Sequence, residues 1–195
     1  MRDPDNIRAL FNIAPDFIGF IFYEKSSRFV KNIPVLPFPD AVKKVGVFVN
    51  ENLDKLLATA AAFPLDLIQL HGAESPDYCR ELASHSYPLI KAFSVDAQFD
   101  FSLTEPYQEY CDYFLFDTKG PLYGGNGQVF DWSLLQQYQG DTPFFLSGGL
   151  GPDSVSALGK FQHTALFGFD INSGFEQAPA MKNIQEIKEF KQQIP

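Results

Sequence analysis

Short apolar runs alternate with helix-like segments along the whole chain, and this rhythm limits the fold more than any other feature. The runs are rich in β-branched and aromatic residues and predict buried strands at 17–23, 44–50, 65–72, 88–95, 113–118, 143–149 and 164–174. Their midpoints recur about every 25 residues without a linker-like break. The pattern indicates a parallel α/β sheet in a single domain over residues 1–195.

The segments between these runs carry helix start signals. Asn50 is a possible N-cap for a helix at 52–63, and Ser75 followed by Pro76 predicts a helix at 75–84. Asp3 followed by Pro4 predicts a helix at the beginning of the chain. Further helices are expected at 131–138, 151–161 and 183–194, with one more inside 96–112.

The exit of nearly every predicted strand carries a polar side chain: Arg28, Asn50, His71, Asp117, Ser147 and Asp170. A doubly wound sheet usually concentrates such groups at one switch point, whereas an eight-stranded barrel builds its site from all strand ends. The sequence therefore predicts a parallel (β/α)8 TIM barrel. Seven strands are visible, and the chain opens on a loop and helix of the kind that follows a first strand, so we expect that strand to be missing from this chain.

Composition excludes several classes of protein. The formal net charge of -9 and the lack of a Lys/Arg-rich run argue against nucleic-acid binding. The polar N-terminus is not a signal peptide, and no apolar run approaches the roughly 18 residues of a membrane span. Cys79 and Cys111 form neither a metal motif nor a disulfide framework. We expect a cytoplasmic monomer or homodimer without a metal or a membrane partner.

Asp117 ends a predicted strand directly before the glycine-rich segment "KGPLYGGNGQ" (119–128). Gly124, Gly125 and Gly127 give a backbone that can move or approach a ligand closely. A carboxyl group at the carboxyl end of a barrel strand, beneath such a loop, is well placed for general acid catalysis. The alternative interpretation is a helix cap or a surface carboxylate.

The stretches "LSGGL" (146–150) and "DINSG" (170–174) place small residues after the last two predicted strands. Exposed backbone N–H groups before a helix form an anion pocket, and TIM barrels often bind phosphate after strands seven and eight. The candidate phosphate-site residues are Ser147, Gly148, Gly149, Asp170, Asn172, Ser173 and Gly174. The alternative is a pair of tight turns that need glycine.

Four further side chains are candidates for the same site. Arg28 can bind a substrate carboxylate bidentately, or it is a solvated surface charge. Gln69 and His71 have one parity along their strand, so both can point into the barrel, although a lone His is more often structural. Lys91 suits the Schiff-base lysine of an aldolase, but a buried polar contact is the simpler interpretation.

Together these motifs resemble the phosphoribosylanthranilate isomerase family of tryptophan biosynthesis. The resemblance runs from Met1 to near the end of the chain, through "GFIFYEKSSRFV", "KVGVFVN", "IQLHGAE", "FLFDTKGPLYGGNGQVFDW", "FFLSGGL" and "DINSGFE". It implies an Amadori rearrangement of a small phosphorylated substrate, N-(5-phosphoribosyl)anthranilate, without a metal or organic cofactor.

The resemblance also implies roles for individual residues. Asp117 would be the general acid, and Arg28 would bind the anthranilate carboxylate. The backbone around Gly148, Gly149, Ser173 and Gly174 would bind the phosphate, with Asp170 nearby.

One family feature is not found in this sequence. The family's general base is a cysteine in a Lys-x-Cys-Gly-like motif directly before the segment that matches "MRDPDN". Cys111 lies six residues before Asp117, roughly 20 Å away at about 3.3 Å per residue, and Cys79 lies in a predicted outer helix. We expect the true start to lie upstream of Met1, with a shortened chain as the alternative, and we expect the chain as written to be inactive or poorly soluble.

Two other functional classes stay open. One is a non-catalytic phosphosugar-binding remnant of such a barrel. The other is a different phosphosugar barrel enzyme, either an indole-glycerol-phosphate synthase-like lyase or a Schiff-base aldolase that uses Lys91.

Overall fold

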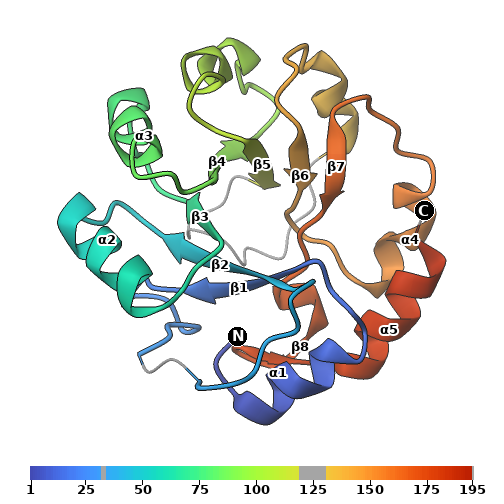
Figure 1. Cartoon of the computed structure of the whole chain (residues 1–195). Helices are drawn as coiled ribbons and strands as arrows, with labels where there is room; N and C mark the ends of the chain where they lie inside the picture. Colours follow the sequence, from blue (N-terminus) through green and yellow to red (C-terminus); the bar gives the residue numbers. More distant parts are fainter. Residues whose placement is uncertain (32–33, 119–130, 195) are drawn as a thin grey trace.

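Seven parallel strands form a curled sheet in the computed structural model, which describes residues 1–31, 34–118 and 131–194. Each strand pairs in parallel with the next along the chain, so the spatial order is β1 to β7. Figure 1 shows the strands arranged around a common centre, with helices outside. The strands are β1 (Phe17–Ile21), β2 (Lys43–Phe48), β3 (Leu67–Leu70), β4 (Leu89–Val95), β5 (Tyr113–Thr118), β6 (Phe144–Leu146) and β7 (Leu166–Phe169). The predicted seven-stranded α/β barrel architecture is confirmed.

The α-helices of the described residues are α1 (Pro4–Phe11), α2 (Leu53–Ala62), α3 (Pro76–Ala83), α4 (Val155–Leu158) and α5 (Ile184–Gln193). Asp3 and Ser75 cap α1 and α3 as expected, because their side chains accept hydrogen bonds from backbone N–H groups in the first turn. The expected cap of α2 was wrong. Asn52 caps that helix, whereas Asn50 has a φ of 50° and accepts a hydrogen bond from the N–H of Ala73.

Three expected helices are shorter or tighter than the sequence suggested. Residues 96–112 hold the 3-10 helix η1 (Phe101–Tyr107), and 131–138 hold the 3-10 helix η2 (Trp132–Gln137). Both begin after an Asp side chain that accepts a hydrogen bond two residues ahead, a local bond that competes with α-helix. The region 151–161 contains η3 (Pro152–Ser154) followed by the four-residue helix α4.

The last predicted strand, 164–174, was too long. The chain leaves the sheet after β7 and forms the 3-10 turn η4 (Ser173–Phe175). An antiparallel hairpin of β8 (Glu176–Ala178) and β9 (Met181–Lys182) follows, which the sequence did not predict. This hairpin places two charged residues, Glu176 and Lys182, at the edge of the barrel.

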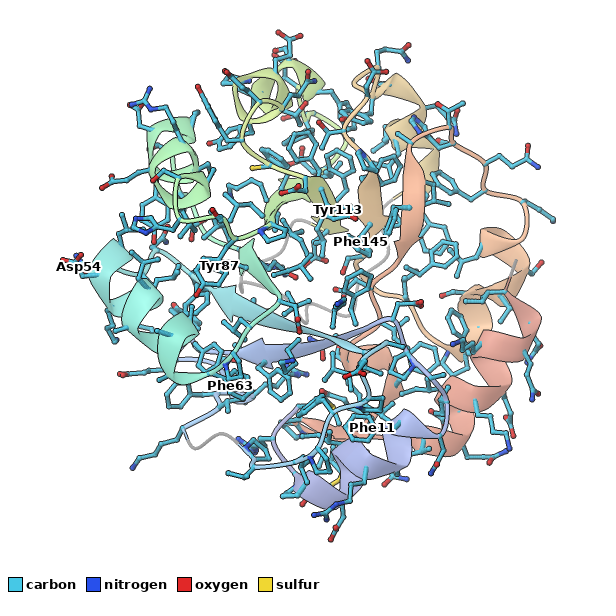
Figure 2. The ribbon with its side chains drawn as sticks, viewed as in Figure 1. Phe11, Asp54, Phe63, Tyr87, Tyr113 and Phe145 are labelled. Atoms are coloured by element: carbon cyan, nitrogen blue, oxygen red, sulfur yellow. The ribbon has the colours of Figure 1, made fainter. Side chains whose placement is uncertain are left out.

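Apolar side chains pack on both faces of the curled sheet because neighbouring residues of a strand point to opposite faces. The inner layer is a compact cluster of Val45, Leu67, Ile90, Ala92, Leu115 and Phe145. A larger cluster fills the space between the sheet and the helices. In Figure 2, Tyr113 and Phe145 lie within the ring of strands, and Phe11 and Phe63 lie outside it. The many phenylalanines are therefore mainly packing residues.

Candidate functional site

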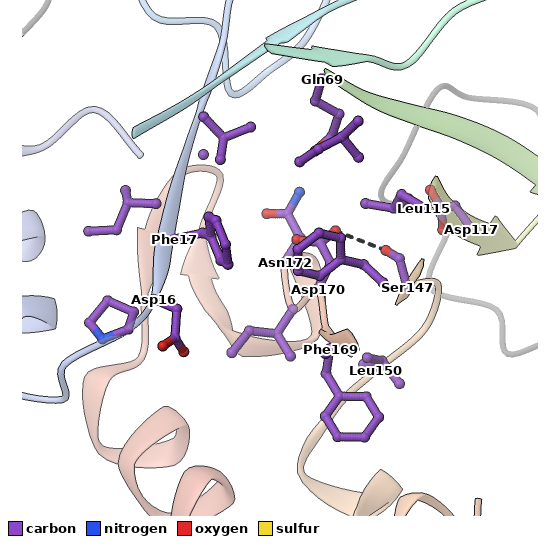
Figure 3. A pocket seen from close by; sticks show the side chains of 18 of the residues that line it. Asp16, Phe17, Gln69, Leu115, Asp117, Ser147, Leu150, Phe169, Asp170 and Asn172 are labelled. Carbon is purple, nitrogen blue, oxygen red and sulfur yellow. Dashed lines mark hydrogen bonds between the residues drawn. The ribbon is translucent and has the colours of Figure 1, made fainter. Parts of the chain in front are cut away.

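A cavity of about 1090 Å³ is lined by residues at the carboxyl ends of the strands, by inner residues of the sheet and by residues of α1 and α5. It continues toward Phe17 at the amino end of β1 (Figure 3). Every predicted site residue except Gly174 lines it: Arg28, Gln69, His71, Asp117, Ser147, Gly148, Gly149, Asp170, Asn172 and Ser173. The structure brings these ten residues together around one cavity, and their roles stay predictions.

Asp117 lies at the end of β5 and is joined to a short polar chain. His71 Nε2 is 3.4 Å from Asp117 Oδ2, and His71 Nδ1 is 2.7 Å from Gln69 Nε2. All three side chains are largely buried. The Gln69 amide can present either its N–H group or its oxygen to His71 Nδ1. The group that it presents determines which ring nitrogen of His71 carries the proton. The tautomer of His71 therefore decides whether Nε2 donates to the Asp117 carboxyl group or accepts from it.

Asp170 follows β7 and is the second carboxyl group of the site. Its Oδ2 accepts a 2.9 Å hydrogen bond from Ser147 Oγ, drawn as a dashed line in Figure 3. Burial raises the pKa of Asp170, and the negative charge of Asp117 adds to this, while the Ser147 hydroxyl opposes it. The two carboxyl groups are therefore close enough to affect one another.

This raised pKa predicts the effect of Asp170→Asn on stability. Above its ordinary pKa of 3.8, the carboxyl loses its proton more readily in the unfolded chain than in the folded one. Ionisation therefore destabilises the folded protein at neutral pH. We expect Asp170→Asn to raise the thermal unfolding midpoint at pH 7, with a gain that shrinks below about pH 4, where both states are protonated.

A surface carboxyl provides the control for that measurement. Asp131 is exposed, and hydrogen bonds from Ser133 lower its pKa, so Asp131→Asn should not raise the midpoint. An unchanged or lower midpoint for Asp170→Asn at pH 7 would contradict the pKa argument.

The two glycine-containing loops lie against each other. A Cβ atom on Gly174 would collide with the carbonyl oxygen of Leu150, so only glycine allows this approach. Gly148 and Gly149 have φ angles of 89° and 70°, a conformation that also favours glycine. Because α4 is only four residues long, the backbone N–H groups of the loops are the main features suited to an anion.

Arg28 lines the cavity, but it is not a free surface charge. Its Nε donates to Glu176 Oε1 and Oε2 at 3.1 and 2.8 Å, and its Nη2 lies 2.7 Å from Oε2. Lys182 Nζ donates to Glu176 Oε1 and also to the backbone and side-chain oxygens of Asn172. Sequence reasoning missed Glu176 and Lys182, although the charges flanking "QAPAM" were a visible signal.

The pKa values of this cluster follow from burial and charge. Burial opposes ionisation of Glu176, but the hydrogen bond from Arg28 and the charge of Lys182 outweigh it, and the pKa of Glu176 is lowered. Burial also lowers the pKa of Lys182, against the attraction of Glu176.

Lys91 is on the outer face of β4 and does not line the cavity. Its amine donates to Glu74 Oε2 at 3.2 Å and to the carbonyl oxygens of Leu70, Gly72 and Ala92. Glu74 accepts in turn from the N–H groups of Asn50 and Gly72. This arrangement favours the buried polar contact over the Schiff-base interpretation.

Neither cysteine reaches the cavity. Cys79 and Cys111 are buried in the packing between the sheet and the outer elements, and neither belongs to the cavity lining. The glycine-rich loop with Gly124, Gly125 and Gly127 lies outside the described residues, so its role stays a prediction.

The described residues offer neither a metal site nor a membrane span. Across 1–31, 34–118 and 131–194, no three His, Cys, Asp or Glu residues gather as metal ligands. None of the helices in the same ranges has the length and apolarity needed to cross a membrane.

Comparison with known proteins shows which family the chain is similar to. Residues 1–193 match the family model described as N-(5′-phosphoribosyl)anthranilate (PRA) isomerase. The chain is 47% identical over 199 residues to the N-(5′-phosphoribosyl)anthranilate isomerase of Parabacteroides distasonis, and the match covers 100% of this chain and 90% of that relative.

Solved structures agree with this match. The phosphoribosyl anthranilate isomerase of Thermotoga maritima superposes with a TM-score of 0.82 at 34% identity. A phosphoribosyl anthranilate isomerase in complex with reduced 1-(o-carboxyphenylamino)-1-deoxyribulose 5-phosphate gives a TM-score of 0.80 at 31% identity. Both superpositions cover 99% of this chain and 94% of the other.

Proposed function

The chain belongs to the N-(5′-phosphoribosyl)anthranilate isomerase family, and we propose that it converts N-(5-phosphoribosyl)anthranilate to 1-(2-carboxyphenylamino)-1-deoxyribulose 5-phosphate in tryptophan biosynthesis. The observation that carries this proposal is the placement of Asp117 in a cavity that also contains Arg28 and the two glycine loops. A proton donor, a carboxylate-binding group and an anion site are what this substrate requires.

The substrate has two anionic ends, which suggests its orientation. The phosphate is proposed to bind the N–H groups around Gly148, Gly149, Ser173 and Gly174. The anthranilate carboxylate is proposed to bind Arg28. The ribose then lies between these two ends, within reach of Asp117. The complex of a related structure with a reduced product analogue supports a ligand of this size and charge.

The proposed reaction moves protons without any change of redox state. Asp117 donates a proton to the furanose oxygen, the bond between that oxygen and C1 breaks, and the nitrogen lone pair forms a C1–nitrogen double bond. A base then removes the proton from C2, the C2–H bonding pair forms the C1–C2 double bond of an enolamine, and the C1–nitrogen π pair returns to nitrogen. Proton transfer from the C2 hydroxyl to C1 finally gives the ketone.

His71 and Gln69 are proposed to orient the Asp117 carboxyl group toward the substrate. The base is a separate requirement. The resemblance assigns it to a cysteine that is neither Cys79 nor Cys111, and turnover is proposed to depend on that group.

A direct assay tests the proposal. Incubation of N-(5-phosphoribosyl)anthranilate with the protein purified from its own cell should give the deoxyribulose product, and expression of the gene with its upstream sequence should restore growth without tryptophan to a strain lacking this isomerase. Tight binding of the reduced product analogue with no conversion under either condition would favour the non-catalytic binder. If the protein neither binds the reduced product analogue nor converts the substrate, the proposed function is wrong.

A further inference from the structure

We propose that Glu176 is a positioning residue for substrate selection, because it holds Arg28 so that one edge of the guanidinium is presented to a carboxylate-bearing aromatic amine. This inference rests on the proposed function. The preference for a carboxylate would then depend on Glu176, which contacts Arg28 and not the substrate.

The geometry separates the two edges of the guanidinium. Glu176 contacts Arg28 through Nε and Nη2, with distances of 2.7 to 3.1 Å. A guanidinium can bind carboxylates along more than one edge, because it has five N–H donors in a fixed plane. With the Nε–Nη2 edge bound by Glu176, the Nη1–Nη2 edge is the one suited to a second carboxylate.

The surroundings make Glu176 a fixed support. Its side chain is 5% exposed, and its carboxylate also accepts from the N–H of Ala180 and from Lys182 Nζ. Bonds on both oxygens restrict rotation of the carboxylate, so the plane of the Arg28 guanidinium is restricted as well.

The charges of the cluster favour an incoming anion. Arg28 and Lys182 are cations and Glu176 is an anion, so the three groups keep one net positive charge. Lys182 also binds Asn172 in the loop proposed to hold the phosphate. The cluster therefore connects the two proposed anion subsites of the substrate.

The matching experiment measures binding of two ligands, so it does not depend on turnover. One is reduced 1-(2-carboxyphenylamino)-1-deoxyribulose 5-phosphate, and the other is its 1-phenylamino counterpart, which lacks the carboxylate. The dissociation constants are measured by calorimetry for the wild type and for Glu176→Gln. The glutamine has the same shape, but it removes the negative charge and turns an N–H donor toward Arg28.

We expect the wild type to prefer the carboxylated ligand by about 10-fold or more, the range of charge-assisted hydrogen bonds. Glu176→Gln should remove most of this preference and leave the affinity for the phenylamino ligand nearly unchanged. Glu74→Gln is the matched control, because Glu74 is an equally buried, ion-paired carboxylate that does not line the cavity. It should leave the preference intact.

The outcomes are distinct. If Glu176→Gln weakens both ligands equally, or changes neither, then Glu176 does not act through Arg28 and the inference fails. If the wild type binds neither ligand, the proposed function itself fails. Should Glu176→Gln not fold, Arg28→Lys serves instead, because it keeps the charge and the partner but has no second edge. Full preference in that variant would also overturn the inference.

Discussion

Asp117→Asn is expected to lower kcat by about 10²- to 10⁴-fold, the usual contribution of a general acid, with little change in substrate affinity. Asparagine has nearly the same shape and can still accept a hydrogen bond from His71, but it has no proton to give to the furanose oxygen. Steady-state kinetics of the isomerisation measure kcat, and binding of the reduced product analogue measures affinity.

The opposite end of the same strand provides the control. Asp112 precedes β5 at the amino end of the barrel, and its carboxylate accepts a hydrogen bond from the N–H of Leu89. Asp112→Asn keeps an acceptor there and should leave kcat unchanged. If Asp117→Asn retains full turnover, Asp117 is not the acid, and Asp170 becomes the carboxyl to test next because it lines the same cavity.

Lys91→Met is expected to destabilise the fold by about 3–5 kcal/mol, because it leaves the buried carboxylate of Glu74 without its partner. The Lys91 side chain is 3% exposed and that of Glu74 is 1% exposed, so water cannot take the place of the missing amine. Urea unfolding, with stability extrapolated to water, measures the change.

Two further variants separate charge from packing. Adding Glu74→Gln to Lys91→Met removes the unpaired charge and should restore part of the stability. Lys55→Met removes an exposed lysine that pairs with Glu51, and the unfolding midpoint should barely move. A Schiff-base enzyme would lose its chemistry with Lys91→Met, whereas here the substrate affinity of the folded fraction should persist. A loss of stability below about 1 kcal/mol would show that the pair is not structurally important.

The alternation of apolar runs predicted the barrel well because each buried strand must be apolar on both faces. The same argument predicted several strands that are too long at their carboxyl ends, where the candidate site lies. His71 and Ser147 lie just beyond β3 and β6, where the chain leaves the sheet to present polar groups to the cavity. Local hydrogen bonds, such as the one that the Ser133 N–H donates to the Asp131 side chain, accompany the shorter 3-10 helices, and hydrophobic periodicity does not reveal them.

The candidate site was predictable where function is tied to a local motif. Asp117 and the Gly148–Gly149 turn could be recognised from the residues next to them in the sequence. Glu176 could not be recognised in this way, because its partner Arg28 lies 148 positions away and only the folded chain brings the two together. A pairing of that separation has no signature in a single sequence.

This long-range junction also has a consequence for folding. Besides Arg28 and Glu176, the Asn6 side chain exchanges two hydrogen bonds with the backbone of Lys182, 176 positions away. Such contacts form only after nearly the whole chain has been ordered, so they add to the contact order and to the loop-closure entropy. A ligand that contacted both Arg28 and the loops around Gly149 and Ser173 would bind only the folded chain. It would therefore stabilise the protein by a free energy that grows with the logarithm of the ligand concentration.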